Sequence, residues 1–162
     1  MFNIYIMKTE TLKKIFTFLE ENGEHNAPLM WKLQNNIPIT EKDDLIVKGG
    51  LSLWDTDITS LPKGLEVRSN LVVAYSKLTS LPEGLKVGDS LNMFDTKIKS
   101  LPEGLVVDRD LYLRGSEIQS LPKGLKVGGF IDLRDTKLTE YTDDDLRKMI
   151  EPDGYIRGKI VR

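Results

Sequence analysis

The chain has 162 residues, enough for one domain with a substantial core, and a formal net charge of −2 from 23 Lys/Arg and 25 Asp/Glu residues. Charges of both signs are mixed along it, so we expect no nucleic-acid binding, which needs basic residues concentrated on one face. The absence of cysteine excludes disulfides, thiolate zinc sites and a cysteine nucleophile. We find neither a membrane-spanning apolar run nor a signal peptide. We therefore expect a cytoplasmic protein, or one delivered into a host cell without a signal peptide.

Residues 1–43 are predicted to form a helical N-terminal cap. The segment Thr9 to Asn22 has apolar residues at helical spacing, which predicts an amphipathic helix. A second, shorter helix is predicted after Pro28, because proline suits the first turn of a helix. The first coil of a repeat array exposes an apolar edge, so we expect these helices to cover it.

Residues 44–141 repeat with a period of 20 residues and without insertions, which predicts a single-domain repeat solenoid. We call residues that lie 20 apart a column. The first apolar columns are Leu51, Leu71, Leu91, Leu111 and Ile131, and then Leu53, Val73, Met93, Leu113 and Leu133. The hydroxyl column is Thr56, Ser76, Thr96, Ser116 and Thr136. Each unit then continues as in Leu61-Pro62, Gly64-Leu65 and Val67.

Each unit is expected to begin with a short strand, because Leu51 and Leu53 alternate with an outward residue. Stacked units place these strands in parallel, about 4.8 Å apart. We expect the hydroxyl column to bond neighbouring backbone groups or to form a ladder along the stack. Gly64 suits a turn with positive φ. Leu65 and Val67 form a second apolar alternation on the far side of the unit.

Residues 142–162 are predicted to form a C-terminal cap of one helix and one strand. Thr142 or Asp143 can cap the helix, and Pro152-Asp153-Gly154 ends it. The segment from Tyr155 to Val161 alternates and is predicted to be a single strand.

The spacing of Leu-x-Leu, Thr/Ser and Leu-Pro over residues 45–141 resembles the bacterial 20-residue class of leucine-rich repeat. The resemblance implies an α+β stack of parallel short strands, of the kind found in secreted effectors and in bacterial and phage proteins. This chain has Thr or Ser where that family usually has asparagine, and its second apolar alternation is more strand-like. A right-handed parallel β-helix is therefore the alternative fold. Some relatives carry a ubiquitin-ligase domain with a cysteine nucleophile, and this activity does not carry over to a cysteine-free chain.

The candidate site is the outward face of the predicted strands, where residues vary from unit to unit. Such variation shows that the fold does not dictate them, and Trp, Tyr, Phe and Arg are typical of protein interfaces. The predicted partner-binding residues are Trp54, Val72, Ala74, Tyr75, Asn92, Phe94, Tyr112, Arg114, Asp132 and Arg134. The alternative without a partner is that another segment of the same chain covers this face, or that the aromatic residues of the face only pack on one another.

Arg114 and Arg134 lie one period apart, so a ligand anion could lie between them. The alternative is that they pair with Asp132, Asp135 or Glu117. The column of Asp55, Asp95 and Asp135 skips units and would place carboxylates about 10 Å apart, too far to share one metal ion. We expect neither a metal nor a cofactor.

The predicted function is a non-catalytic protein-binding module, an adaptor or an inhibitor of a host protein, of phage or effector type. The only histidine, His25, has no nucleophile motif beside it. The alternative is a small-ligand or carbohydrate site on the same face; Asp108 and Asp110 are the nearest candidates for a hydrolytic pair, although we do not expect hydrolysis. Self-association through the terminal strand is a third reading.

Overall fold

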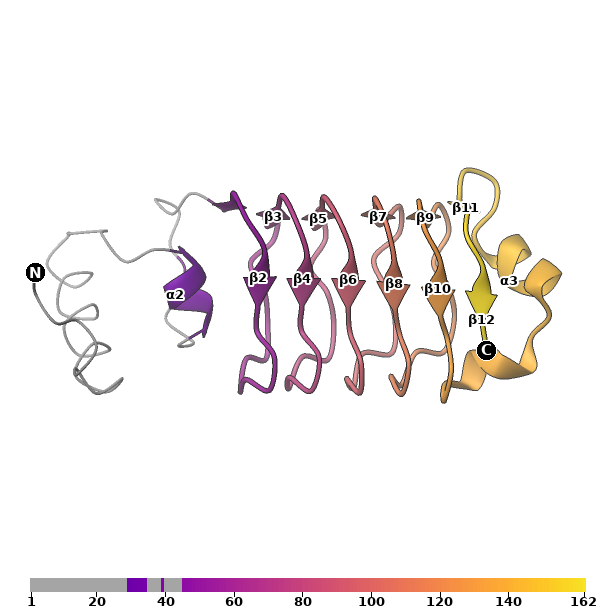
Figure 1. Ribbon diagram of the computed structural model, residues 1–162, viewed down its shortest axis with the longest axis horizontal. Coiled ribbons are helices and arrows are strands. Elements are labelled where there is room, and N and C mark those ends of the chain that lie inside the picture. Colours follow the sequence, from indigo (N-terminus) through magenta and orange to yellow (C-terminus); the bar gives the residue numbers. More distant parts are fainter. Residues whose placement is uncertain (1–28, 35–38, 40–44) are drawn as a thin grey trace, which may run out of the picture.

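The computed structural model describes residues 29–34, 39 and 45–162. The helix predicted at Thr9 to Asn22, and His25, lie outside the described residues. The described chain winds into a stack of coils with a parallel sheet on each of two sides (Figure 1). The β1 sheet has the order β1 (Ile46–Val47), β3 (Glu66–Val67), β5 (Lys86–Val87), β7 (Val106–Val107), β9 (Lys126–Val127) and β11 (Tyr155–Ile156). The β2 sheet has the order β2 (Leu51–Ser52), β4 (Leu71–Val72), β6 (Leu91–Asn92), β8 (Leu111–Tyr112), β10 (Ile131–Asp132) and β12 (Ile160–Val161).

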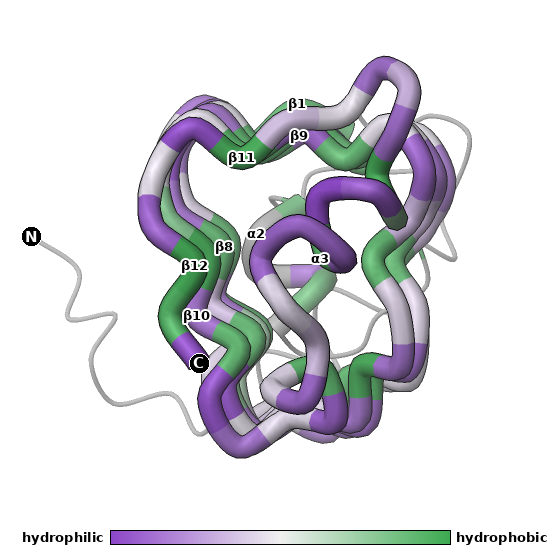
Figure 2. The backbone as a smooth tube through the Cα atoms, turned by 90° about the vertical axis from the view of Figure 1, so that its right-hand side faces the viewer, coloured by the Kyte–Doolittle hydropathy of each residue, from purple (hydrophilic) through white to green (hydrophobic). Residues whose placement is uncertain are grey.

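The architecture is a parallel β-solenoid, and it fits the β-helix alternative because each coil contributes a strand to both sheets. The second apolar alternation, represented by Leu65 and Val67, accounts for this outcome, since it supplies β3 and its copies. In Figure 1 the strands of the β2 sheet run downward on the near side while the chain advances from left to right. Figure 2 shows the chain returning on the opposite side, so the coils are right-handed.

Coils stack in register, so that each column faces its own copy. Leu51 pairs with Leu71 in the β2 sheet, and Val67 pairs with Val87 in the β1 sheet. The Leu51 N–H donates to the Asn70 carbonyl at 2.9 Å, and this pattern repeats from coil to coil. The apolar columns meet inside the stack and form one continuous core. Burying each such side chain contributes roughly 1.5–3 kcal/mol, so the core is the main source of stability.

The hydroxyl column bonds within each coil and does not form a ladder along the stack. The Ser76 Oγ donates to the Val73 carbonyl at 2.6 Å, and the Ser116 Oγ donates to the Leu113 carbonyl at 2.6 Å. The prediction of a hydroxyl ladder is therefore wrong, and its alternative of bonds to neighbouring backbone is confirmed. These bonds close the bend that follows each strand of the β2 sheet.

A side-chain ladder exists at a different corner, immediately before the strands of the β2 sheet. The Ser90 N–H donates to the Asn70 Oδ1 at 3.0 Å, and the Asp110 N–H donates to the Ser90 Oγ at 3.3 Å. The Phe130 N–H then donates to the Asp110 Oδ1 at 3.0 Å. Each polar side chain thus bonds the backbone of the next coil and helps to hold the stack in register.

Glycine turns the chain before the strands β3, β5, β7 and β9 of the β1 sheet, as predicted. Gly64 has a φ of 77°, a region that side chains rarely adopt, and its copies Gly84, Gly104 and Gly124 also have positive φ. The Leu65 N–H closes this turn on the Pro62 carbonyl at 3.3 Å.

Short elements cover the two ends of the described core. The helix α2 (Leu29–Gln34) places Leu33 in the core beside β1. At the other end a 3₁₀ turn, η2 (Lys137–Glu140), leads into α3 (Asp143–Met149), which lies across the open end of the coil in Figure 2. Thr142 and Asp145 form the capping box of α3, which confirms the predicted start of that helix. None of the helices within the described ranges has the length and apolarity of a membrane span.

The prediction of one strand from Tyr155 to Val161 is wrong. The segment forms β11 and β12, which belong to different sheets and are separated by a corner at Gly158. A Cβ atom at Gly158 would lie 2.6 Å from the Gly129 carbonyl oxygen, so this corner can pack on the coil below only without a side chain. The final segment therefore repeats the corner of a coil.

We predict that the Ser116→Ala variant is less stable than the wild type by about 1 kcal/mol, because it loses a buried hydrogen bond to the Leu113 carbonyl. The exposed Ser120→Ala variant is the matched control and should change the stability by less than about 0.5 kcal/mol. Urea denaturation followed by circular dichroism measures both. Equal loss in the two variants would contradict a structural role for the hydroxyl column.

Candidate functional site

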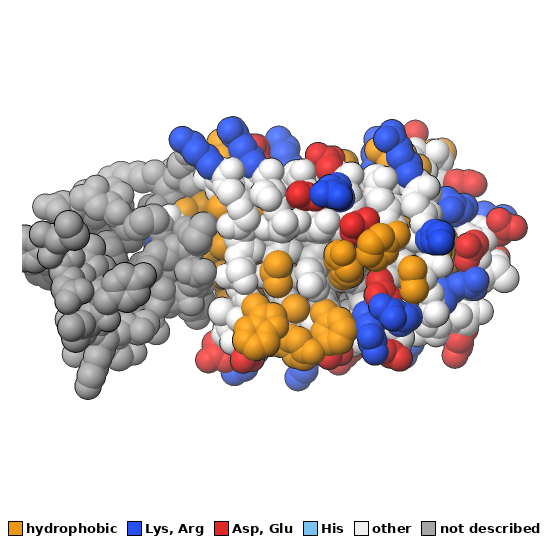
Figure 3. All heavy atoms as spheres, in the orientation of Figure 1, with side chains coloured by type: hydrophobic (Ala, Val, Ile, Leu, Met, Phe, Trp, Pro, Cys, Tyr) orange, Lys and Arg blue, Asp and Glu red, His pale blue; other side chains and the backbone are white. Residues whose placement is uncertain are grey.

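An aromatic row crosses the outward face of the β2 sheet, next to the ends of its strands. We define it as Trp54, Tyr75, Phe94 and Arg114. The Trp54 and Tyr75 ring centroids lie 6.0 Å apart, and those of Tyr75 and Phe94 lie 5.3 Å apart. The Arg114 guanidinium lies 5.6 Å from the Phe94 ring centroid. Four residues from four successive coils thus form one contiguous surface, and Figure 3 shows hydrophobic side chains gathered on this face.

The first two residues of the aromatic row are exposed to solvent: Trp54 is 58% exposed and Tyr75 is 46% exposed. Phe94 and Arg114 are half-buried. Ala74 was predicted to be part of the exposed face, but only 2% of it is exposed. It stands between Trp54 and Phe94 in its column, and the Tyr75 ring joins those two rings across it. Ala74 therefore gives the larger rings room to meet and does not itself present a contact surface.

Tyr75 occupies a turn position whose backbone conformation favours Gly or Asp over tyrosine. Its column has positive φ throughout: 52° at Asp55, 58° at Tyr75, 50° at Asp95, 70° at Gly115 and 59° at Asp135. Gly and Asp tolerate this left-handed conformation, whereas it is an outlier for a bulky side chain. Strained residues of this kind cluster at functional sites. The ring at position 75 is thus held against the local backbone preference.

The same backbone conformation explains the aspartate column without a metal. Asp is among the residues that adopt positive φ most readily, so Asp55, Asp95 and Asp135 suit the turn itself. In the part of the chain that the structure describes, no group of three or more His, Asp or Glu side chains is placed to hold a metal ion.

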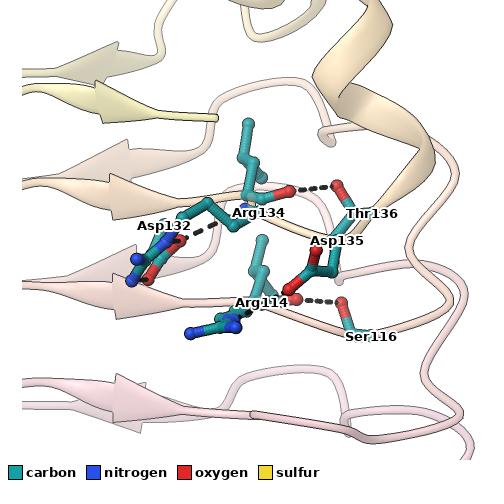
Figure 4. A network of polar contacts seen from close by, with 8 residues as sticks. Arg114, Ser116, Asp132, Arg134, Asp135 and Thr136 are labelled. Atoms are coloured by element: carbon teal, nitrogen blue, oxygen red, sulfur yellow. Dashed lines mark hydrogen bonds and ion pairs between the residues drawn. The ribbon is translucent and has the colours of Figure 1, made fainter.

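The two arginines of the face each have their own carboxylate (Figure 4). Arg134 bonds Asp132 through Nε at 2.9 Å and Nη2 at 2.6 Å, a two-point pair. Arg114 Nε donates to the Asp135 Oδ2 at 2.9 Å. The pairing interpretation is thus the one observed, and the proposed anion between the arginines is not needed to separate their charges.

Asp132 was predicted to face a partner, but it is 5% exposed beneath its arginine. The hydrogen bond from the Arg134 guanidinium holds the pKa of the Asp132 carboxyl below its usual range, and burial opposes this effect only in part. Asp132 therefore acts by fixing Arg134 on the surface. Asn92 has a related role, because its Oδ1 accepts from the Phe94 N–H at 3.0 Å and orders the backbone beneath the row.

A shallow hollow of about 580 Å³ lies at the C-terminal end of the same face. Tyr112 and Phe130 form part of its wall, with ring centroids 5.1 Å apart and nearly perpendicular planes. Burial raises the pKa of the Tyr112 phenol, so this side chain stays neutral. We define the C-terminal hollow by its lining residues Asp110, Tyr112, Gly129, Phe130, Asp132, Arg134, Gly158, Lys159 and Val161.

Phe130 was missed in the sequence analysis. Its column is Gly50, Asn70, Ser90, Asp110 and Phe130, so an aromatic residue in an otherwise polar or small corner column was the available signal. Val72 is half-buried on the face, as is Tyr112. The carboxylate of Asp110 accepts from the Phe130 N–H, which commits it to the side-chain ladder and argues against a hydrolytic pair with the exposed Asp108.

Comparison of the chain with protein-family models, with curated protein sequences and with solved structures found no match.

We predict that Tyr75→Asn is more stable than Tyr75→Val by about 1–2 kcal/mol. Both variants lose the same ring contacts, but Asn tolerates positive φ and the β-branched Val does not. The difference in their free energies of unfolding, measured in urea, therefore isolates the backbone strain at this position. Equal stabilities would show that residue 75 is unstrained.

We predict that the contribution of the Asp132–Arg134 pair to stability depends on pH. Because folding lowers the pKa of Asp132 from its ordinary value of 3.8, the pair contributes fully above that pKa and its contribution falls as the pH drops through the folded value. Asp132→Asn should thus be less stable than the wild type at about pH 7, and the difference should shrink toward about pH 3. Urea midpoints of both proteins across this range test it. A difference that is independent of pH would contradict the assignment.

Proposed function

We propose that this protein is a non-catalytic protein-binding module whose partner docks on the outward face of the β2 sheet. The observation that supports the proposal is the aromatic row, in which Trp54 and Tyr75 are exposed on the surface while the apolar columns inside the stack are buried. Exposed Trp and Tyr beside Arg form the composition of interface hot spots. The strained conformation of Tyr75 adds support, because the turn itself would be better served by Asp or Gly.

The geometry of the rings favours a protein partner over a carbohydrate. A linear glycan would need successive aromatic faces turned the same way, so that its sugar rings could stack on them. In the aromatic row, however, the Trp54 and Tyr75 planes are inclined by 76° and the Tyr75 and Phe94 planes by 49°. Such an edged, uneven surface suits side chains of another protein, which can pack against ring edges and faces alike.

The biological setting that we infer is that of an adaptor or an inhibitor that occludes another protein, of phage or effector type. This inference rests on the resemblance of the repeat to the bacterial 20-residue leucine-rich class, and membership in that class is part of the proposal. The same resemblance leads us to expect action in the cytoplasm, either of the producing cell or of a host cell.

The experiment is affinity capture from a lysate of the native host, followed by mass spectrometry. We expect the double variant Trp54→Ala/Arg114→Ala to lose the captured protein, because it removes both ends of the aromatic row. Arg114 belongs to an exposed ion pair, so its removal should change stability by less than about 1 kcal/mol.

The matched control is Tyr155→Ala/Arg157→Ala, which removes a similar aromatic–arginine contact of 4.8 Å on the β1 sheet. The control should retain the captured protein. Retention by the row variant, or loss in both variants, would show that the partner binds elsewhere.

A further inference from the structure

We propose that the N-terminal half of the aromatic row binds an arginine side chain from a basic segment of the protein partner. This inference rests on the proposed function, because it gives the chemistry of the partner that docks on the same face. The residues that carry it are Trp54 and Tyr75, whose rings are exposed, and Asp55 and Asp95, which flank Tyr75 in its column. We call these four residues the open site.

The C-terminal half of the row already contains a complete arginine site. The Arg114 guanidinium lies 5.6 Å from the Phe94 ring centroid, and its Nε donates to the Asp135 Oδ2 at 2.9 Å (Figure 4). The ring, the guanidinium and the carboxylate come from three successive coils. On this face, therefore, an arginine lies on the ring of the preceding coil and pairs with the carboxylate of the following coil.

Two coils earlier, the same arrangement lacks its cation. The three equivalent positions hold Trp54, Ala74 and Asp95, so alanine replaces the arginine while the ring and the carboxylate remain. The Tyr75 ring crosses Ala74 between the Trp54 and Phe94 rings and adds a second exposed aromatic surface. The open site thus offers rings and a carboxylate to a cation that comes from outside the chain.

The carboxylates of the open site are exposed and unpaired. Partial burial raises the pKa of the Tyr75 phenol, and the negative charge of Asp95 raises it further, which indicates that this carboxylate is near the ring. Among the described residues, neither Asp55 nor Asp95 forms an ion pair, and Lys97, two residues after Asp95, pairs with neither. Unpaired carboxylates beside exposed rings are complementary to a cation.

The packing of the rings favours a flat cation over a quaternary ammonium group. The centroids of Trp54 and Tyr75 lie 6.0 Å apart, and those of Tyr75 and Phe94 lie 5.3 Å apart. Rings in mutual contact cannot surround a bulky ammonium group as an aromatic cage does. A guanidinium is planar, so it can stack on one exposed ring face and donate two parallel hydrogen bonds to a carboxylate. Arginine therefore uses both parts of the open site, whereas lysine can only pair.

The charge around the open site favours a basic segment and not a lone arginine. Asp55 and Asp95 lie two coils apart, which separates them by about 10 Å. One guanidinium cannot bond both, so the second carboxylate favours a further basic residue in the same segment. The arginines at the other end of the face are each paired with a carboxylate, so they add little repulsion.

NMR of the full chain, titrated with a capped hexa-arginine peptide, tests the proposal. The indole N–H signal of Trp54, identified by its loss in Trp54→Phe, reports binding at the open site. We expect a saturable shift of this signal, and at least about threefold weaker binding of matched peptides of lysine and of citrulline, the uncharged analogue of arginine. A Trp54 signal that does not move, or equal binding of either comparison peptide, would overturn the proposal.

The carboxylates are tested with Asp55→Asn/Asp95→Asn, because asparagine tolerates the positive φ of both turns. We expect the dissociation constant of the arginine peptide to rise about fivefold, as for the loss of two surface ion pairs. The matched control, Glu103→Gln/Asp108→Asn, removes the same charge from exposed positions outside this face and should change the constant by less than about twofold. Equal loss in the two double variants would show that only net charge matters and would overturn the site.

The capture experiment separates this inference from the proposed function. Loss of the captured protein in both Trp54→Ala/Arg114→Ala and Asp55→Asn/Asp95→Asn supports the two together. Loss in the first variant with retention in the second would overturn the arginine site and leave the proposed function standing. Retention in both variants would overturn the proposed function and the arginine site with it.

Discussion

In-register hydrogen bonding between successive coils is the constraint on which the rest of the structure depends. Each coil must place its strands in the same register and orientation as those of the preceding coil. A one-residue shift in register would turn the buried columns toward solvent. Leu51 opposite Leu71 and Val67 opposite Val87 show this register in the two sheets. The ladder of Asn70, Ser90 and Asp110 reinforces it at one corner. The requirement applies to inward columns and turns, so the outward columns of the β2 sheet are free to carry a binding surface.

One turn position joins this constraint to function. The turn after the strands β2, β4, β6, β8 and β10 requires positive φ at the position equivalent to Tyr75. The other coils have Asp or Gly at that position. Tyr75 adopts a backbone conformation that is unfavourable for a tyrosine, and its ring contacts those of Trp54 and Phe94 on the surface. The two contacts together contribute about 1–3 kcal/mol, against a conformational cost of about 1–2 kcal/mol, so they offset the strain with little net gain in stability. Recognition of a partner supplies the reason for the tyrosine in our proposal.

The period of 20 residues was sufficient to predict the solenoid, the parallel strands and the turn at Gly64, since these follow from which columns are apolar and where glycine recurs. It was not sufficient to choose between a horseshoe and a β-helix, because both place Leu51 and Leu53 inward. The hydroxyl ladder was assigned to the wrong column, since a Ser or Thr can bond its own coil or its neighbour equally well by residue type. The final segment was misread because alternation does not reveal the corner at Gly158. On the face, the columns were predicted correctly, but the burial of Ala74 and Asp132 depends on large neighbours that periodicity does not place.

The most direct test of the interface is hydroxyl-radical footprinting of the full chain alone and in the complex isolated by affinity capture, with peptide-level mass spectrometry. Trp54, Tyr75 and Phe94 report on the aromatic row, and Tyr155 reports on the β1 sheet within the same molecule. We expect the three row residues to lose reactivity together as complexes form, while Tyr155 keeps its reactivity. Protection of Tyr155 with unchanged reactivity of the row in the isolated complex would contradict this expectation.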